Sequence, residues 1–438
     1  MKIASARVIV TCPGRNFVTL KIETDEGVTG MGDATLNGRE LAVATCLTEH
    51  LFPLLEGEDP LRIEHLWQSL YIGAYWRGGP VQNSALAGID MALWDILGKE
   101  AGQPIYQLLG GRTRDGAMAY VHTAGTTPEK VLERVQKKQA EGFRAIRIQL
   151  EMSAGAVYGE KPHQSRSRSA AADDAAAAHP SRPAHAPPVV QSPAEKTMPL
   201  LIQRKLPFVG EWEPTPYARS LPKLFAHVRG AVGDDVELLH DVHHRLSPIE
   251  AAGLARELEP YHPFFFEDPI APEYREGLSL IRQTSSVPIA IGEGFFDIST
   301  CVALITARLL DYLRCDLGHI GGITPARKLA TICEPFCVKT AWHGPPDLGP
   351  VGHAANVHVD VSVPNFGVQE WFDHAAAPNF TSCAEVFRGG VSVREGYLDV
   401  PATPGLGIEV NEEAARKYPY RRAYLPVVRR SDGSVHPW

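Results

Sequence analysis

Glu237-Leu238-Leu239-His240-Asp241-Val242-His243-His244 is a short apolar run that ends in a carboxylate and a pair of imidazoles. Two later apolar runs end in the same way, one at Glu267 and the other at Glu293. The interval from Asp241 to Glu267 equals the interval from Glu267 to Glu293, and it suits one strand, one helix and their loops. Acids that recur at the carboxyl ends of buried strands predict a barrel of parallel strands that holds a hard divalent cation at one end.

The composition is typical of a soluble globular protein, since 44% of the 438 residues are hydrophobic and 21% are charged. The formal net charge of -8 argues against a nucleic-acid-binding protein, because such proteins normally carry a basic excess. No apolar run approaches the roughly 20 residues of a membrane helix, and the N-terminus lacks the apolar core of a signal peptide. The seven cysteines form no CxxC pair. We therefore expect a protein of the reducing cytoplasm, without nucleic-acid or membrane partners.

Residues 1–115 are predicted to form an N-terminal α+β domain. Residues 1 to about 34 are predicted to be antiparallel strands, because β-rich stretches flank a turn signal at Asp25-Glu26-Gly27. Residues 84–101 form the clearest helix, since their apolar side chains recur at three- and four-residue steps. The glycine-bracketed stretch 30–38 is predicted to be a loop, either a plain connector or a flap over a site.

Residues 116–390 are predicted to form a catalytic barrel, because strand-like and helix-like stretches alternate along them. The candidate strands are as many as a (β/α)8 barrel needs, and they cover residues 118–124, 143–150, 235–242, 263–267, 288–293, 312–317, 337–342 and 367–371. The predicted fold class is therefore α/β, a TIM-like barrel with an N-terminal α+β capping domain.

One segment interrupts the barrel pattern and another ends it. Residues at about 160–200 are rich in Ser, Arg, Ala and Pro and have too little apolar content to offset their ordering entropy. They are predicted to be a mobile insertion after the second strand, either a solvated linker or a lid over the active site. Residues 391–438 no longer alternate, and they are predicted to pack back on the capping domain.

Several motifs in these elements resemble those of one family. The broader signature is Ala87-Gly88-Ile89-Asp90-Met91-Ala92-Leu93-Trp94-Asp95, followed by Tyr106-Gln107-Leu108-Leu109-Gly110-Gly111. The more specific motifs are Asp241-Val242-His243-His244-Arg245, Phe266-Glu267-Asp268-Pro269, His343-Gly344-Pro345-Pro346-Asp347, Val363-Pro364-Asn365-Phe366-Gly367-Val368-Gln369-Glu370 and Lys417-Tyr418-Pro419-Tyr420. On these motifs the chain resembles the enolase superfamily, and more closely its mannonate dehydratase branch, over nearly its whole length except about 160–200. The resemblance implies a capping domain over the barrel, an essential Mg2+ and removal of the proton next to a carboxylate.

Asp241, Glu267 and Glu293 are the predicted Mg2+ ligands. Removing a proton next to a carboxylate creates a dianionic enolate, which needs strong electrostatic stabilisation. Mg2+ on three carboxylates supplies it as a Lewis acid while holding the substrate carboxylate. Asp268 directly follows Glu267, so we expect its side chain on the other face of the strand. The alternative is that the three acids are unrelated residues at strand ends.

The predicted base is not the lysine that many relatives carry on the second barrel strand, because residues 144–150 contain none. The mannonate dehydratase pattern instead uses an arginine on this strand and a tyrosine beyond it, and Arg147 and Tyr158 match those positions. A guanidinium near a phenol favours the phenolate and lowers the phenol pKa from about 10. The alternative is that Arg147 pairs with a barrel acid and Tyr158 is an ordinary aromatic residue at the base of a loop.

His243 matches the acid that protonates the leaving hydroxyl in this family. It lies two residues after Asp241 and is expected on the same strand face, whereas His244 is expected to point away and to be structural. His343, after the seventh strand, is a second candidate base, because Asp316 at the end of the sixth strand is placed to orient the imidazole and raise its pKa. We expect His343 mainly to bind substrate, with Asp316 tuning it.

The resemblance also assigns the residues around the substrate, which are Asn37, His122, Arg314, His343, Asp347, Glu370 and Trp438. The predicted function is a Mg2+-dependent hydro-lyase that converts D-mannonate to 2-keto-3-deoxy-D-gluconate and water. D-Gluconate or another sugar acid is the alternative substrate for the same chemistry. A weakly active or non-catalytic relative, which binds sugar acids or has a regulatory role, is the alternative of another class. The expected partners are the small acid-sugar substrate and further copies of the chain in a homo-oligomer.

Overall fold

The computed structural model describes residues 1–151, 208–375, 377, 380, 382–423, 425 and 427–437. The predicted insertion at about 160–200, Tyr158 and Trp438 lie outside the described residues. Within the described ranges, no helix is both long and apolar enough to cross a membrane.

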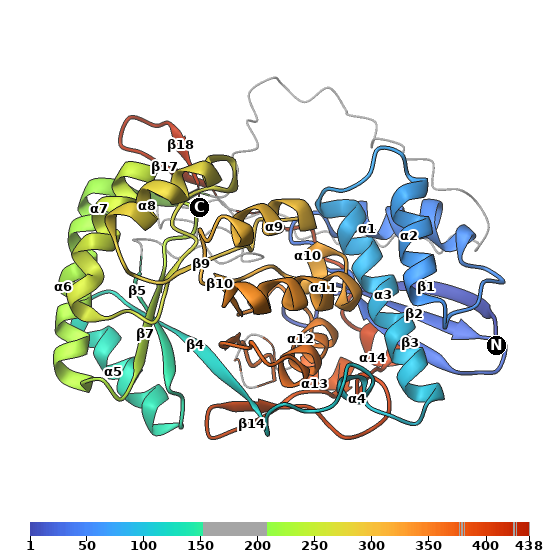
Figure 1. Cartoon of the computed structure of the whole chain (residues 1–438). Helices are drawn as coiled ribbons and strands as arrows, with labels where there is room; N and C mark the ends of the chain where they lie inside the picture. Colours follow the sequence, from blue (N-terminus) through green and yellow to red (C-terminus); the bar gives the residue numbers. More distant parts are fainter. Residues whose placement is uncertain are drawn as a thin grey trace, which may run out of the picture.

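The N-terminal part is an antiparallel sheet covered by helices, at the right of Figure 1. Its strands are β1 (Ile3–Thr11), β2 (Phe17–Thr24) and β3 (Thr29–Asp33), in the order β1-β2-β3. The helices are α1 (Glu40–Thr45), α2 (Ile63–Gly73), α3 (Pro80–Glu100) and the short α4 (Ile105–Leu108). The prediction of a loop over 30–38 is wrong for residues 30–33, because β3 runs to Asp33.

Strand β3 packs so closely on helix α3 that only glycine fits at the contact. A Cβ atom on Gly30 would lie 2.0 Å from the backbone oxygen of Ala92, and one on Gly32 would lie 1.8 Å from that of Gly88. Glycines in a strand often mark such a close approach of another backbone. The glycines that resemble loop signals in the sequence are therefore contact points between a strand and a helix.

The central part is a closed barrel of parallel strands. The strands are β4 (Ala117–Gly125), β5 (Ala145–Leu150), β7 (Glu237–Asp241), β8 (Phe266–Glu267), β9 (Ile289–Ile291), β10 (Tyr312–Leu313), β11 (Lys339–Thr340) and β12 (Gln369–Glu370). From β4 to β11, each strand pairs with the next strand of this series, and β12 pairs with β4. A bridge between Thr340 of β11 and Phe366, just before β12, closes the ring of strands. All the predicted barrel strands overlap these elements, so the predicted barrel fold is confirmed.

Helices cover the outside of the barrel, with α5 to α8 at the end opposite the N-terminal sheet in Figure 1. They are α5 (Pro128–Ala140), α6 (Pro214–Val232), α7 (Pro248–Leu258), α8 (Leu278–Thr284), α9 (Ile298–Thr306), α10 (Leu317–Ile320), α11 (Ile323–Cys333) and α12 (Pro350–Ser362). Inside, a separate cluster of buried side chains comprises Tyr120, Ala145, Leu239, Phe265, Ala290, Tyr312, Ala341 and Val368. The barrel interior is therefore a packed core, which leaves the strand ends as the place for chemistry.

Helix α3 joins the N-terminal part to the barrel through its acids. Thr324, in the first turn of α11, donates its backbone N–H to Asp90 Oδ2 at 2.9 Å, while Trp94 Nε1 donates to Thr324 Oγ1 at 2.9 Å. Asp95 accepts the backbone N–H groups of Met31 at 2.9 Å and Leu406 at 2.7 Å. The motif residues of α3 thus cap a barrel helix and join three distant segments, which explains why these polar groups are buried.

The C-terminal segment contacts both parts of the molecule. Its elements are α13 (Cys383–Val386), β13 (Phe387–Gly389), β14 (Ser392–Arg394), β15 (Tyr397–Asp399), β16 (Ile408–Val410), α14 (Glu412–Ala415), β17 (Val427–Arg429) and β18 (Val435–His436). Glu412 forms an ion pair with Arg7 of β1 at 2.7 Å, whereas β17 pairs with β6 (Phe208–Glu211). The predicted domain limits, 1–115, 116–390 and 391–438, stay predictions.

We predict that Gly32→Ala destabilises the protein by about 3 kcal/mol, because the new Cβ would overlap a backbone oxygen in a packed contact. Thermal denaturation followed by circular dichroism measures this. The matched control is Gly253→Ala in α7, where a Cβ meets nothing within 4 Å, so alanine should be neutral or stabilising by up to about 1 kcal/mol. Equal melting temperatures for the two variants would contradict the packing account.

Candidate active site

Acidic residues gather at the carboxyl ends of the barrel strands. Asp241 ends β7, Glu267 ends β8, and Glu370 ends β12. Asp268, Glu293 and Asp316 come just after strand ends. Five of the six are buried, and the side chain of Glu293 is 13% exposed. So many buried carboxylates require nearby positive charge or hydrogen-bond donors.

Arg147 on β5 balances the first of these acids. Its Nη1 donates to Asp241 Oδ2 at 2.8 Å, and its Nη2 lies 3.0 Å from His122 Nδ1. His122 Nε2 in turn lies 2.7 Å from Glu370 Oε1. Burial and the Arg147 charge lower the pKa of His122. Burial opposes the charge of Arg147, but Asp241, Tyr120, Glu267 and Glu370 together raise the pKa of Arg147 above its usual value. The structure therefore contains the ion pair between Arg147 and a barrel acid that the sequence left open.

Arg314 on the loop after β10 is completely buried and balances two acids. Its Nη2 lies 2.6 Å from Glu267 Oε1 and 2.7 Å from Glu370 Oε2. Burial opposes its charge, but Glu267, Tyr120, Glu370 and Asp268 together raise the pKa of Arg314 well above its usual range. The Tyr120 hydroxyl donates to both oxygens of Glu267, at 3.0 and 3.1 Å. Burial nevertheless raises the pKa of Glu267 well above its usual value.

Glu293 faces three imidazoles. His343 Nε2 lies 3.2 Å from its carboxylate, and the Nε2 atoms of His244 and His243 lie 3.7 and 3.8 Å from it. Burial would raise the pKa of Glu293, but His243, His343 and His244 together hold it well below its usual range. His343 Nδ1 also lies 3.0 Å from Asp316 Oδ2, so the predicted His–Asp contact is present. Despite burial, Glu370, Asp316 and Glu293 raise the pKa of His343 well above its usual value.

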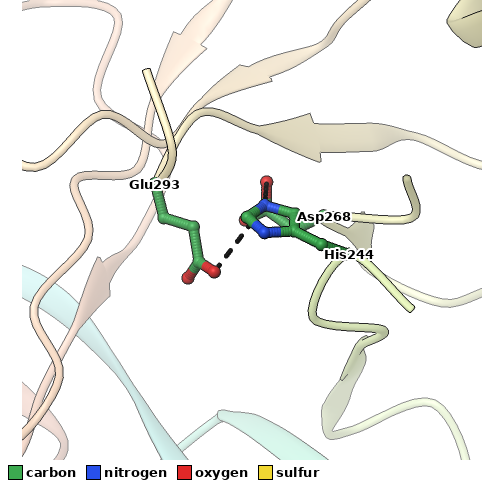
Figure 2. Close-up of side chains that lie close together, drawn as sticks. All are labelled: His244, Asp268 and Glu293. Carbon is green, nitrogen blue, oxygen red and sulfur yellow. Dashed lines mark ion pairs between the residues drawn. The ribbon is translucent and has the colours of Figure 1, made fainter. Parts of the chain in front are cut away.

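His243, His244 and Asp268 adopt left-handed backbone conformations, with φ of 58°, 63° and 37°. Strands β7 and β8 have already ended there, so side chains no longer alternate between two faces. The expectation that His244 points away is therefore wrong. Figure 2 shows His244 beside Asp268 and Glu293, with Nε2 3.3 Å from Asp268 Oδ1. Strained conformations of this kind cluster at functional sites.

Two sets of side chains qualify as metal ligands, and they share Glu293. The ligand atoms of His244, Asp268 and Glu293 all lie within 4.8 Å of one another, the only such group among the described residues. In the predicted set, Asp241, Glu267 and Glu293 instead form ion pairs with Arg147, Arg314 and His343, respectively. An all-carboxylate set suits Mg2+, whereas an imidazole ligand suits transition metals. On donor chemistry, the predicted set fits Mg2+.

The N-terminal part also reaches the site. Asn37 Nδ2 donates to Asp347 Oδ2 at 3.0 Å, and Arg15 Nη2 lies 3.9 Å from the same oxygen. The sequence reasoning missed Arg15 and Tyr120. Tyr120 had a usable signal, because it lies two residues before His122 on β4 and so shares its strand face. Arg15 lies in the turn between β1 and β2, and no pattern there points to it.

Comparison with known proteins identifies two matching family models, similar relatives and a similar solved structure. Residues 5–110 match the family model described as mandelate racemase / muconate lactonizing enzyme, N-terminal domain, and residues 213–414 match enolase C-terminal domain-like. The chain is 46% identical to D-galactonate dehydratase family member RspA of Halomonas elongata and 46% identical to a D-mannonate dehydratase of Caulobacter sp., with 100% of each chain covered. It is also similar to the crystal structure of an enolase from Pantoea ananatis with bound D-gluconate and Mg, with a TM-score of 0.86, 42% identity and 100% of both chains covered.

We predict that Glu267→Gln weakens Mg2+ binding by about 100-fold or more, because it removes one carboxylate of the predicted set. Isothermal titration with MgCl2 measures this, and circular dichroism checks the fold. Asp268→Asn is the matched control, since Asp268 is the next residue, is equally buried and belongs only to the other set. It should bind Mg2+ within about tenfold of the parent. The opposite order of affinities would assign the metal to His244, Asp268 and Glu293.

Proposed function

The chain belongs to the enolase superfamily, and on this premise we propose that it is a Mg2+-dependent dehydratase of sugar acids. The observation that carries the proposal is the gathering of carboxylates, Arg147, Arg314 and histidines at one end of the barrel. These groups occur in a chain that is related along its whole length to proteins named as dehydratases.

The proposed substrate is D-mannonate, which is converted to 2-keto-3-deoxy-D-gluconate and water. Relatives that are 44 to 46% identical over the full chain carry the name D-mannonate dehydratase. D-Gluconate is the second candidate, because the similar Pantoea ananatis structure has bound D-gluconate and Mg. The two acids differ only in configuration at C2, and the reaction removes that stereocentre, so both give the same product.

Asp241, Glu267 and Glu293 would hold the Mg2+ ion, which when bound supplies Lewis-acid stabilisation for the substrate carboxylate. Arg147 and Arg314 orient Asp241 and Glu267 through contacts of 2.8 and 2.6 Å. Oriented carboxylate ligands are what a hard cation requires.

The chain's own residues would then move two protons. Tyr158, assisted by Arg147, is proposed to take the proton from C2. His243 is proposed to protonate the C3 hydroxyl, so that the C3–O bond breaks and water leaves. The resulting enol becomes the 2-keto product. His343 already contacts both Asp316 and Glu293, and we assign it to substrate binding with Asn37, His122, Arg314, Asp347, Glu370 and Trp438.

We predict that the purified protein forms a 2-keto-3-deoxy acid from D-mannonate with Mg2+, that EDTA abolishes product formation, and that added Mg2+ restores it. A panel of hexonates and pentonates, read as 2-keto product by semicarbazide absorbance, tests this and ranks D-mannonate against D-gluconate. Absence of turnover on every acid would overturn the enzyme proposal. Binding of an acid without turnover would then favour the non-catalytic, sugar-acid-binding alternative.

We predict that His243→Asn lowers kcat by about 10²- to 10⁴-fold, the usual contribution of a positioned proton donor. Steady-state kinetics on the preferred acid measures this. His227→Asn is the control, because His227 is exposed on α6, and it should keep the parent kcat. An unchanged kcat in His243→Asn would remove His243 from the proposed role.

A further inference from the structure

We propose that His353 and His374 are positioning residues that hold the active-site segment His343–Asp347 through the backbone oxygens of Pro345 and Pro346. The proposal rests on the proposed function for the meaning of the site, but the contacts that carry it are structural. It adds two side chains that come from outside the barrel strands.

The segment is held by few backbone hydrogen bonds, in which His343 donates to the Cys315 oxygen at 3.2 Å and Leu348 donates to the Pro345 oxygen at 3.1 Å. Pro345 and Pro346 have no N–H groups, so only their carbonyl oxygens can be anchored. The segment is also short, with His343 at one end and Asp347 at the other. A shift of either proline therefore moves both of these side chains relative to the barrel.

Two buried imidazoles add contacts to both proline oxygens. His353, in the first turns of α12, has Nε2 3.2 Å from the Pro345 oxygen. His374, which follows β12, has Nε2 3.0 Å from the Pro346 oxygen. A carbonyl oxygen only accepts hydrogen bonds, so both Nε2 atoms must carry the proton. Each ring therefore donates from Nε2, which fixes the tautomer of the neutral ring.

The environment of the rings keeps them neutral and oriented. Burial lowers the pKa of His353 to about 4 and that of His374 well below its usual value. The two rings meet edge to face with centroids 5.2 Å apart, and Trp371 and Phe17 pack edge-on against them, at 5.0 and 5.4 Å. Since Phe17 belongs to β2, this packing connects the N-terminal sheet with the active-site segment.

Other side chains hold the two ends of the same segment. Asn356 Nδ2, also on α12, donates to the His343 oxygen at 3.1 Å, and Gly344 donates its N–H to Glu370 Oε2 at 3.0 Å. Asn37 donates to Asp347 at 3.0 Å. Pro345 and Pro346 are the middle residues of this segment, between the two ends that these contacts hold. A cavity of about 420 Å³ borders both His353 and His374, so loss of a proline contact would not be made good by tight packing there.

The test compares ring variants that keep or remove the donor. His353→Phe and His374→Phe keep an aromatic ring without the N–H, whereas His353→Gln and His374→Gln keep a donor near Nε2. His358→Phe is the matched control, because His358 lies on the same helix, is fully buried, has a pKa of about 4 and has Nε2 3.2 Å from the Leu406 oxygen. If His374→Phe does not fold, His374→Asn replaces it, because the asparagine amide is too short to reach the Pro346 oxygen.

The first readout is hydrogen–deuterium exchange, with Mg2+ present, at the amides of residues 343, 344, 347 and 348. The Phe variants should exchange about fivefold to tenfold faster there, as expected for one lost hydrogen bond, while the Gln variants stay within about twofold of the parent. His358→Phe should lower the melting temperature without changing exchange in this segment. Unchanged exchange in the Phe variants, or the same change in His358→Phe, would overturn the proposal.

The second readout is the ratio of kcat/KM for D-mannonate and D-gluconate. Because the segment carries two proposed substrate ligands, the ratio should shift by about threefold or more in the Phe variants but not in His358→Phe. If the parent turns over no sugar acid while exchange changes as expected, the proposed function fails and the positioning role stands. If turnover is normal but neither readout changes, the positioning role fails alone.

Discussion

Two arginines, Arg147 and Arg314, carry the fixed positive charge on which the buried acids at the carboxyl ends of the barrel strands depend. Without them, Asp241, Glu267 and Glu370 would be buried carboxylates with too few partners, and burying such groups is costly. With them, the carboxylates are held at the strand ends, where a hard divalent cation can be bound. The remaining negative charge, on Glu293 and Asp316, is met by histidines, and these are the groups that can also move protons.

The N-terminal part contributes more than a cover. Asp90 of α3 caps the barrel helix α11, and the carboxylate of Asp33 lies against Gly349 at the start of α12. Burial raises the pKa of Asp90 to about 7 and that of Asp33 to about 6. Helix α12 also carries His353 and Asn356, so the N-terminal sheet and the active-site segment both contact this helix.

The sequence was sufficient for the barrel because strand-like apolar runs alternate with helix-like stretches, and the even spacing of Asp241, Glu267 and Glu293 reflects repeated β-α units. It was not sufficient where local pattern and tertiary packing disagree. Gly30 and Gly32 resemble loop residues but lie in a strand against a helix. His244 fails a strand-alternation argument because the strand ends at Asp241. Partners such as Tyr120 for Glu267 depend on which strands become neighbours in space, which spacing alone does not specify.

Anomalous diffraction from crystals soaked with Mn2+ would show whether Asp241, Glu267 and Glu293 form the metal site. Mn2+ is a hard divalent ion that prefers oxygen ligands, as Mg2+ does, and it gives a measurable anomalous signal. We predict one strong peak within about 2.0 to 2.4 Å of an oxygen atom from each of these three carboxylates. A peak bound instead by His244, Asp268 and Glu293 would contradict it.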